Sequence, residues 1–211
     1  MIEYLSKYYD DVLTMFIEHL LLTVSSLGIA LLFALPIGYL LSKIKAIAVP
    51  SLAVLGLIYA IPSIALFALL IPFLGLGMKP AITGLVAYSQ LILVRNTVVG
   101  FQSIDRSVLD AGRGMGLNGW QMFWKIQLQL AFPIVLGGIR IATVSIIGIG
   151  TIAAWINAGG LGELLFEGLY QNAKHKIIIG TVLVSLLAIL TNQSLLWLEN
   201  RASLKAKGEL S

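Results

Sequence analysis

The sequence contains no cysteine and few charged residues, and both shortages narrow what the protein can be. Without cysteine there are no disulfides, no thiol nucleophile and no cysteine-ligated metal. Charged residues make up 11% of the 211 residues, whereas hydrophobic residues make up 58%. A soluble domain has about 25% charged and about 45–50% apolar residues. So few charges cannot cover the surface of a soluble domain of this size, and the composition indicates an integral membrane protein.

The charged residues divide the chain into long windows that contain none of them, at residues 20–42, 46–78, 80–94, 141–162 and 177–198. A transmembrane helix needs about 20 apolar residues to cross about 30 Å of hydrocarbon. The windows are apolar all round, whereas the strands of a membrane β-barrel alternate with a period of two. We therefore predict an all-α membrane protein with five transmembrane helices, at about 20–41, 51–73, 81–102, 134–157 and 177–198.

The distribution of lysine and arginine orients these five spans. If the N-terminus lies outside, the outer segments contain only Lys7, Lys79, Lys174 and Lys176. The cytoplasmic segments then contain twice as many, namely Lys43, Lys45, Arg106, Arg113, Lys125, Arg201, Lys205 and Lys207. Because positive residues are in excess in cytoplasmic segments, we expect the N-terminus outside and a cytoplasmic tail at residues 201–211.

The first 18 residues carry apolar side chains at nearly helical spacing, including Ile2, Leu5, Val12 and Phe16. This spacing predicts an amphipathic segment over residues 1–18 that lies on the outer membrane surface. A helix that packs on a partner subunit gives the same spacing, so the periodicity leaves both interpretations open.

The longest stretch without a span, residues 103–133, connects the third and fourth spans on the inner side. A connection of this length is more often functional than a simple link. Glycines interrupt two helical patterns, and Asn118 with Gln121 matches a capping box, so we predict a helical hairpin. Tryptophans beside charged residues are typical of an interface anchor, while an aromatic belt at the lipid interface is the alternative.

The hairpin also carries a family motif. Asp110-Ala111-Gly112, then Gly116 after three residues and Ile126-Gln127-Leu128 after nine more, resembles the EAA loop of ATP-binding-cassette importer permeases. That pattern reads Glu-Ala-Ala, glycine and Ile-x-Leu-Pro, so Asp110, Gly112 and Gln129 depart from it. The resemblance implies a coupling helix that docks in a cleft on an ATPase, through Asp110, Ala111, Gly112, Arg113, Gly116, Leu117, Trp120 and Trp124.

Three further segments, Leu93–Thr97 with Gly100, Gly137–Arg140 and Ala158–Gly162, resemble permeases of the osmoprotectant uptake group. The resemblance covers about residues 15–200 and implies the type I importer permease fold in a bacterial inner membrane. It also implies import of glycine betaine, carnitine, choline or a similar solute, the alternative being another small solute such as an amino acid. The implied partners are an ABC ATPase dimer that binds the ATP and Mg²⁺, a second permease copy or paralogue, an extracytoplasmic substrate-binding protein and lipid.

Arg95, with Asn96 beside it, and Arg140 stand in or beside apolar helices. An ionisable residue within a membrane suggests a function such as gating or coupling. Arginine also snorkels to the interface, so structural anchoring or pairing is the other interpretation.

Gly159, Gly160 and Gly162 end the fourth span on the outer side. Three glycines in four residues suggest a tight turn that places a short outer helix, at about 163–170, against a gate or the binding protein. An ordinary helix stop is the alternative.

Tyr59, Tyr88 and Trp155 lie on the predicted spans, where their aromatic faces can hold a quaternary ammonium group by cation–π contact. Simple packing is the alternative for all three. His19 and His175 are expected at the membrane interface, and no cluster of ligands suggests a metal site.

Other classes of function lack the residues that they need. The chain has no Walker A pattern, so it is not its own ATPase. The predicted spans contain no Asp, Glu or Cys, which disfavours an intramembrane enzyme and an ion-coupled secondary transporter or channel. No dense basic stripe points to nucleic acid. We therefore expect a non-catalytic transport subunit that binds no cofactor itself.

Overall fold

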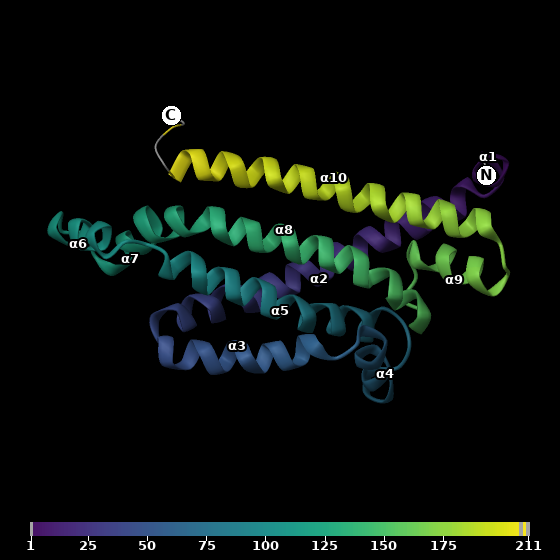
Figure 1. The fold of residues 1–211 in the computed structure, drawn as a ribbon, viewed down its shortest axis with the longest axis horizontal. Coiled ribbons are helices and arrows are strands. Elements are labelled where there is room, and N and C mark those ends of the chain that lie inside the picture. The colour runs from purple at the N-terminus through teal and green to yellow at the C-terminus, as the bar shows by residue number, and fades with distance from the viewer. Residues whose placement is uncertain (1, 207–208, 210–211) are drawn as a thin grey trace.

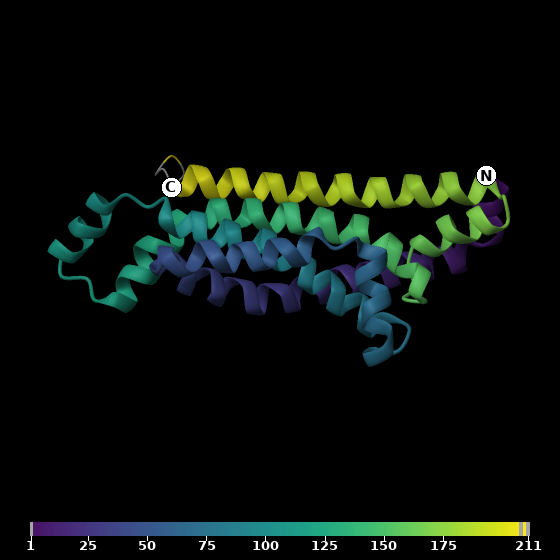
Figure 2. The same ribbon diagram turned by 60° about the horizontal axis from the view of Figure 1, so that its bottom comes forward.

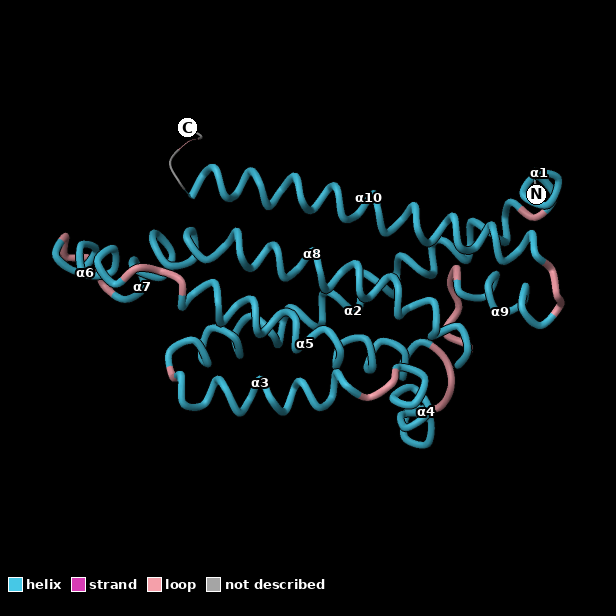
Figure 3. Tube along the Cα trace, viewed as in Figure 1, coloured by secondary structure: helices cyan, strands magenta, loops and turns pink. Residues whose placement is uncertain are grey.

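The computed structural model describes residues 2–206 and Glu209, and within them it is helical with no strand (Figure 3). The helices are α1 (Ile2–Lys7), α2 (Tyr9–Lys43), α3 (Lys45–Ala60), α4 (Ser63–Leu74), α5 (Met78–Gln102), α6 (Arg106–Gly114), α7 (Gly119–Met122), α8 (Leu128–Ala153), α9 (Gly162–Tyr170) and α10 (Lys174–Ala206). A π-helical segment, η1 (Phe123–Gln127), joins α7 to α8, and a 3-10 turn, η2 (Ala154–Ile156), follows α8.

Four of these helices are long and apolar enough to cross a membrane. They are α2, α5, the continuous helix Gly119–Ile156 that contains α8, and α10. The pair α3 and α4 passes the same test together, which gives up to five spans. The prediction of an all-α membrane protein with about five spans is thereby confirmed.

The long helices lie side by side along an elongated bundle (Figure 1). In its middle α5 packs between α2 and α8, and α10 packs on α8 and α9. The hairpin of α6 and α7 projects from one end, where the chain also ends, while α1 and α9 lie at the other end (Figures 1 and 2). The two ends of the bundle therefore carry different candidate sites.

Small residues hold α2, α5 and α8 together. A Cβ atom at Gly138 of α8 would lie 2.5 Å from the Cβ of Asn96 on α5, and one at Gly38 of α2 would lie 2.5 Å from the Cβ of Thr97. Buried alanines continue this contact, at Ala30, Ala34, Ala131 and Ala142. Small residues let membrane helices approach closely, and association in lipid depends on such packing.

The predicted span at 51–73 is not one straight helix. It is covered by α3 and α4, which meet at an angle of 91°. Proline at position 62 favours an extended residue before it, and Ile61 is extended. The hydroxyl of Tyr88 on α5 donates a hydrogen bond to the Ile61 carbonyl, and Phe67 of α4 is fully buried. The break is thus fixed by a proline and by contacts with α5.

Other boundaries also differ from those predicted. Residues 9–18 continue into α2 instead of forming a separate surface segment, because Val12, Met15 and Phe16 pack with buried residues of α9 and α10. Helix α8 begins at Leu128 and contains Pro133, so the non-spanning connection is shorter than 103–133. Helix α10 continues to Ala206, while residues 207, 208, 210 and 211 of the predicted tail lie outside the described residues.

The close contact between α5 and α8 predicts that Gly138→Ala destabilises the protein. The added methyl group meets Asn96 with no space to relax, and such overpacking costs about 1–3 kcal/mol. The measurement is the thermal unfolding of the detergent-purified protein. Gly148→Ala is the matched control on the same helix, because nothing lies within 4 Å of its added Cβ atom. An equal loss in both variants would contradict this account of the core.

Candidate functional site

The candidate site is the hairpin of α6 and α7. Its first half is α6, which is capped at both ends. Asp105 caps its start, since its side chain accepts a hydrogen bond from the Ser107 backbone N–H at 2.8 Å. That backbone hydrogen bond, with a second from the Ser107 side chain, lowers the pKa of Asp105. At the other end Gly116 has φ +78°, and the Leu117 N–H bonds to the Gly112 carbonyl. This is a Schellman motif, whose left-handed position favours glycine.

The second half begins at the predicted capping box, which is confirmed. The Asn118 side chain accepts from the Gln121 N–H at 2.9 Å, and the Gln121 side chain accepts from the Asn118 N–H at 3.1 Å. From Gly119 the helix runs through the π-helical segment into α8 without a break. The hairpin is therefore a direct extension of a membrane-spanning helix.

The hairpin presents large apolar side chains to solvent. Met115 is 72% exposed, Trp120 is 71% exposed, and Trp124 forms an edge-on pair with Trp120 at 5.5 Å between ring centroids. Such exposed apolar residues in one place indicate an interaction surface. Asp110 and Arg113 form an exposed ion pair beside them, at 3.0 Å, which contributes little to stability.

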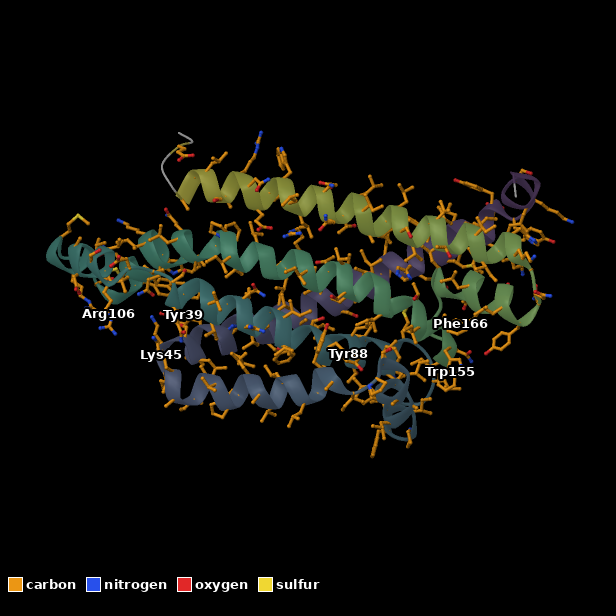
Figure 4. The ribbon with its side chains drawn as sticks, in the orientation of Figure 1. Tyr39, Lys45, Tyr88, Arg106, Trp155 and Phe166 are labelled. Atoms are coloured by element: carbon orange, nitrogen blue, oxygen red, sulfur yellow. The ribbon has the colours of Figure 1, made fainter. Side chains whose placement is uncertain are left out.

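The other predicted hairpin residues separate into buried and exposed positions. A Cβ atom at Gly112 would lie within 3 Å of the side chains of Met122 and Ile126, so Gly112 lets the two halves of the hairpin meet. Ala111 is exposed and Leu117 is half-buried. Arg106, at the start of α6, also lies at this end of the bundle (Figure 4).

Three aromatic rings, which we call the aromatic joint, fix the base of the hairpin to the bundle. They are Tyr39 of α2, Phe101 of α5 and Phe123 of the π-helical segment. Tyr39 contacts each of the other two edge-on at 4.9 Å, and Phe101 stacks with Phe123 at 6.1 Å. Lys43 lies 4.5 Å above the Tyr39 ring and donates to Gln127 at 3.2 Å. Sequence reasoning missed this joint, because no spacing along the chain links three separate helices.

The two singled-out arginines have different environments. Arg140 Nε donates to the Glu199 carboxylate at 2.8 Å, and its NH1 donates to the Asn192 side chain at 3.1 Å. Arg95 is exposed on α5 and has no ion pair among the described residues. The neighbouring Asn96 donates to the Ile92 carbonyl at 2.8 Å and packs on Gly138. The geometry of Arg140 thus fits the pairing interpretation.

The glycine segment at the other end is a turn that needs glycine. Gly159 and Gly160 have φ of +79° and +85°, and a Cβ atom at Gly162 would lie 2.0 Å from the Thr151 carbonyl oxygen. The Gly160 N–H donates to the Glu18 carboxylate of α2 at 2.9 Å. The turn leads into α9, which matches the short helix expected at about 163–170. Sequence reasoning missed Glu18, which lies 142 residues away.

His19, expected at the membrane interface, is packed within the protein beside Gly160. It is fully buried on α2, with Nε2 at 3.1 Å from the Ile147 carbonyl oxygen of α8. His175, by contrast, contacts the ring of Tyr4 at 5.0 Å at the N-terminal end of the bundle. Among the described residues, no group of three His, Asp or Glu side chains could hold a metal ion.

The structure brings two of the three candidate solute-path residues together. The Tyr59 and Tyr88 rings meet edge-on at 5.8 Å, at the bend between α3 and α4. They line a depression with Ser89 and Ser145 that is too small to admit a water molecule. Trp155 lies in η2, apart from this pair (Figure 4).

Comparison with known proteins gives consistent matches. The sequence profile of the family described as "Binding-protein-dependent transport system inner membrane component" matches residues 30–204. The carnitine transport permease protein OpuCB of Listeria monocytogenes is 34% identical, over 90% of this chain and 87% of that protein. The glycine betaine/carnitine/choline transport system permease protein OpuCB of Bacillus subtilis is 35% identical, over 89% and 87%.

A third relative and a solved structure extend these matches. The osmoprotectant import permease protein OsmW of Salmonella typhimurium is 39% identical, over 87% of this chain and 86% of that protein. The inward-facing MetNI methionine ABC transporter has a chain with a TM-score of 0.82 at 23% identity, covering 91% of this chain and 96% of that chain. The fold is therefore that of a type I ABC importer permease.

The ion pair of α8 and α10 predicts that Arg140→Gln destabilises the protein, since it leaves the half-buried Glu199 carboxylate without its partner. The expected cost is about 1–3 kcal/mol in thermal unfolding of the detergent-purified protein. Adding Glu199→Gln to this variant should recover part of the loss. Arg95→Gln is the control, because Arg95 is exposed on the bundle surface. If both arginine variants are equally destabilised, the pairing interpretation of Arg140 is wrong.

Proposed function

The chain belongs to the family of binding-protein-dependent transport system inner membrane components, and from this premise we propose that it imports a quaternary ammonium osmoprotectant as a permease subunit. Membership makes it a component of ABC importers in the inner membrane. The printed names of three relatives support the class of solute, since they specify carnitine, glycine betaine, choline or osmoprotectants. The likeness to a methionine transporter, at 23% identity, is one of fold and does not support an amino acid as solute.

The observation that carries the mechanism is the exposed apolar surface of the hairpin. In this proposal Met115, Trp120 and Trp124 insert into a cleft on the ATPase subunit, while Asp110 and Arg113 lie at the rim. Aromatic residues in the centre of an interface supply most of its binding energy. Gly112 and Gly116 contribute by letting the hairpin close and turn, and Ala111 and Leu117 complete the docked surface.

The proposed orientation places the N-terminus outside and the hairpin in the cytoplasm. It rests on the excess of lysine and arginine at the hairpin end of the bundle. The hairpin and the C-terminal end of α10 lie at the same end, and the N-terminus at the opposite end (Figure 1). An ATPase in the cytoplasm can therefore reach the hairpin, and a binding protein outside can reach α9 and the glycine turn.

The work is divided between this chain and its partners. In this proposal the permease catalyses nothing, and ATP and Mg²⁺ bind to an ATPase dimer. A second permease, either a copy or a paralogue, completes the pathway, and an extracytoplasmic binding protein delivers the solute. Of the two tyrosines at the bend, Tyr59 would present its ring to the passing solute, since it is exposed and aromatic faces attract quaternary ammonium groups, whereas the buried Tyr88 would hold the Tyr59 ring in place.

Motion of the ATPase would reach the pathway through two connections. The first is the continuous helix from Gly119 to Ile156, which joins the hairpin to the glycine turn. The second is the aromatic joint, which ties the base of the hairpin to α2 and α5. Both connections favour movement of the helices as packed bodies, which is how interfaces produce two discrete states.

Trp120→Ala tests the docking surface. The loss of a 71% exposed ring leaves the fold unchanged but should weaken binding of the ATPase subunit about tenfold to thirtyfold. The measurement is the amount of ATPase that co-purifies with the permease, followed by ATP-dependent uptake in proteoliposomes. Phe73→Ala is the control, since Phe73 is 85% exposed on α4, away from the hairpin. Normal co-purification and uptake by the Trp120 variant would overturn the coupling assignment.

Gly116→Ala tests the shape of the hairpin. An alanine at φ +78° costs about 1–2 kcal/mol, which should distort the turn and reduce the ATPase that co-purifies. Gly114→Ala is the matched control, because both positions have open space around an added Cβ atom and only Gly116 has a left-handed backbone. The same ATPase yield from both variants would show that the turn is not needed for docking.

A further inference from the structure

A cleft of about 630 Å³ lies at the N-terminal end of the bundle, opposite the hairpin (Figure 1). It is formed by α1, the first ten residues of α2, α9 and the start of α10. Ligand pockets for small molecules have volumes of about 300–1,000 Å³. None of the residues assigned above to coupling, gating or the solute path lines this cleft.

The lining of the cleft carries an excess of negative charge. Asp11, Glu18, Glu163 and Glu167 face a single lysine, Lys176. Glu18 accepts a hydrogen bond from the Gly160 N–H, and Glu167 pairs with Lys176. Among the described residues, the carboxylates of Asp11 and Glu163 have no ion pair.

The crowding of carboxylates has an effect on Glu163. Its partial burial, followed by the nearby charges of Glu18 and Glu167, raises the pKa of Glu163. A cation bound beside this side chain would stabilise its ionised form.

Aromatic rings form the other part of the lining. The ring centroids of Tyr4 and Tyr8 lie 4.8 Å apart. The Tyr4 ring also contacts the His175 ring, at 5.0 Å between centroids. Rings beside carboxylates match the two interactions that a methylated ammonium ion makes, because it is weakly hydrated and polarises aromatic faces.

The cleft already holds one ammonium group by both kinds of contact. The Lys176 side chain is 14% exposed, and its Nζ donates to the Glu167 carboxylate at 2.7 Å. The same Nζ lies 5.8 Å from the centre of the Tyr4 ring. Lys176 thus shows that a cation fits between a carboxylate and an aromatic ring here, and of its two contacts the one with the ring is open to a quaternary ammonium, which has no N–H to donate.

We propose that this cleft is a binding site for a small quaternary ammonium cation, held by the Glu163 carboxylate and the rings of Tyr4 and Tyr8. The inference rests on the proposed function for its purpose, as an outer site that collects solute before it enters the pathway. The three carboxylates of the lining that have no ion pair, those of Asp11, Glu18 and Glu163, repel a carboxylate on the ligand. The cleft therefore prefers a net cation such as choline to a zwitterion such as glycine betaine.

Binding of radiolabelled choline to the permease–ATPase complex in lipid nanodiscs, without any binding protein, tests the site. We expect saturable binding that excess tetramethylammonium displaces and that glycine betaine displaces at least about tenfold less effectively. Absence of saturable choline binding, or equal displacement by both competitors, would overturn the proposal.

Variants locate the bound choline. Glu163→Gln and the double variant Tyr4→Leu with Tyr8→Leu should each weaken choline binding about fivefold to tenfold. Asp10→Asn and Tyr9→Leu are matched controls, since both residues are exposed neighbours that do not line the cleft, and they should bind as the wild type does. Equal binding by Glu163→Gln, the double tyrosine variant and the controls would place choline elsewhere.

Uptake assays separate this inference from the proposed function. If proteoliposomes with the binding protein import an osmoprotectant but the nanodisc complex binds no choline, only the cleft assignment fails. If ATP drives uptake of none of the quaternary ammonium solutes while the nanodisc complex still binds choline, the proposed function fails and the cleft remains a cation site.

Discussion

The close approach of α2, α5 and α8 is the constraint on which the rest of the structure depends. In lipid there is no hydrophobic effect to drive helices together, so their association relies on packing and a few hydrogen bonds. Glycine at positions 38 and 138 places the backbones where a Cβ atom would collide with the neighbouring helix. Because α5 and α8 are held in this way, the hairpin that connects them has a fixed base. Because α2 and α8 are held in the same core, Glu18 of α2 can also reach the glycine turn that follows α8, at the end of the bundle away from the hairpin.

The packed helices connect the two ends of the bundle, which differ in the side chains that they expose. The hairpin end presents tryptophan and methionine to solvent, whereas the opposite end presents carboxylates and tyrosines. A helix of 38 residues runs from Gly119 to Ile156 between them. This helix is π-helical where it leaves the hairpin, and π-bulges often occur at functional sites. Phe123 of this segment belongs to the aromatic joint, so the base of the hairpin contacts α2 and α5 as well as continuing into α8.

Local patterns could be predicted from the sequence, and long-range contacts could not. The structure contains both the capping box of Asn118 with Gln121 and the short helix α9. Each depends on residues that are neighbours in the sequence. The bend at Pro62 was missed because a charge-free window looks the same whether its helix is straight or broken. The pairing of Arg140 with Glu199 and of Glu18 with the Gly160 backbone joins residues 59 and 142 positions apart. The burial of His19 was missed for the same reason, since it depends on α8 and not on the residues next to it in the sequence.

The distribution of ionisable groups fits the transport of a cation. On α8 the charge of Arg140 is paired with that of Glu199 of α10, so the pair carries little net charge. At the bend of α3 and α4 the exposed ring of Tyr59 offers a cation–π contact, which is worth about 0.5–2 kcal/mol. A pathway must bind its solute weakly enough to release it. Carboxylates in the pathway would hold a quaternary ammonium too tightly, whereas in the outer cleft they can concentrate the cation without stopping its passage. On the proposed assignment, strong electrostatic attraction belongs at the entrance and weak aromatic contact belongs inside.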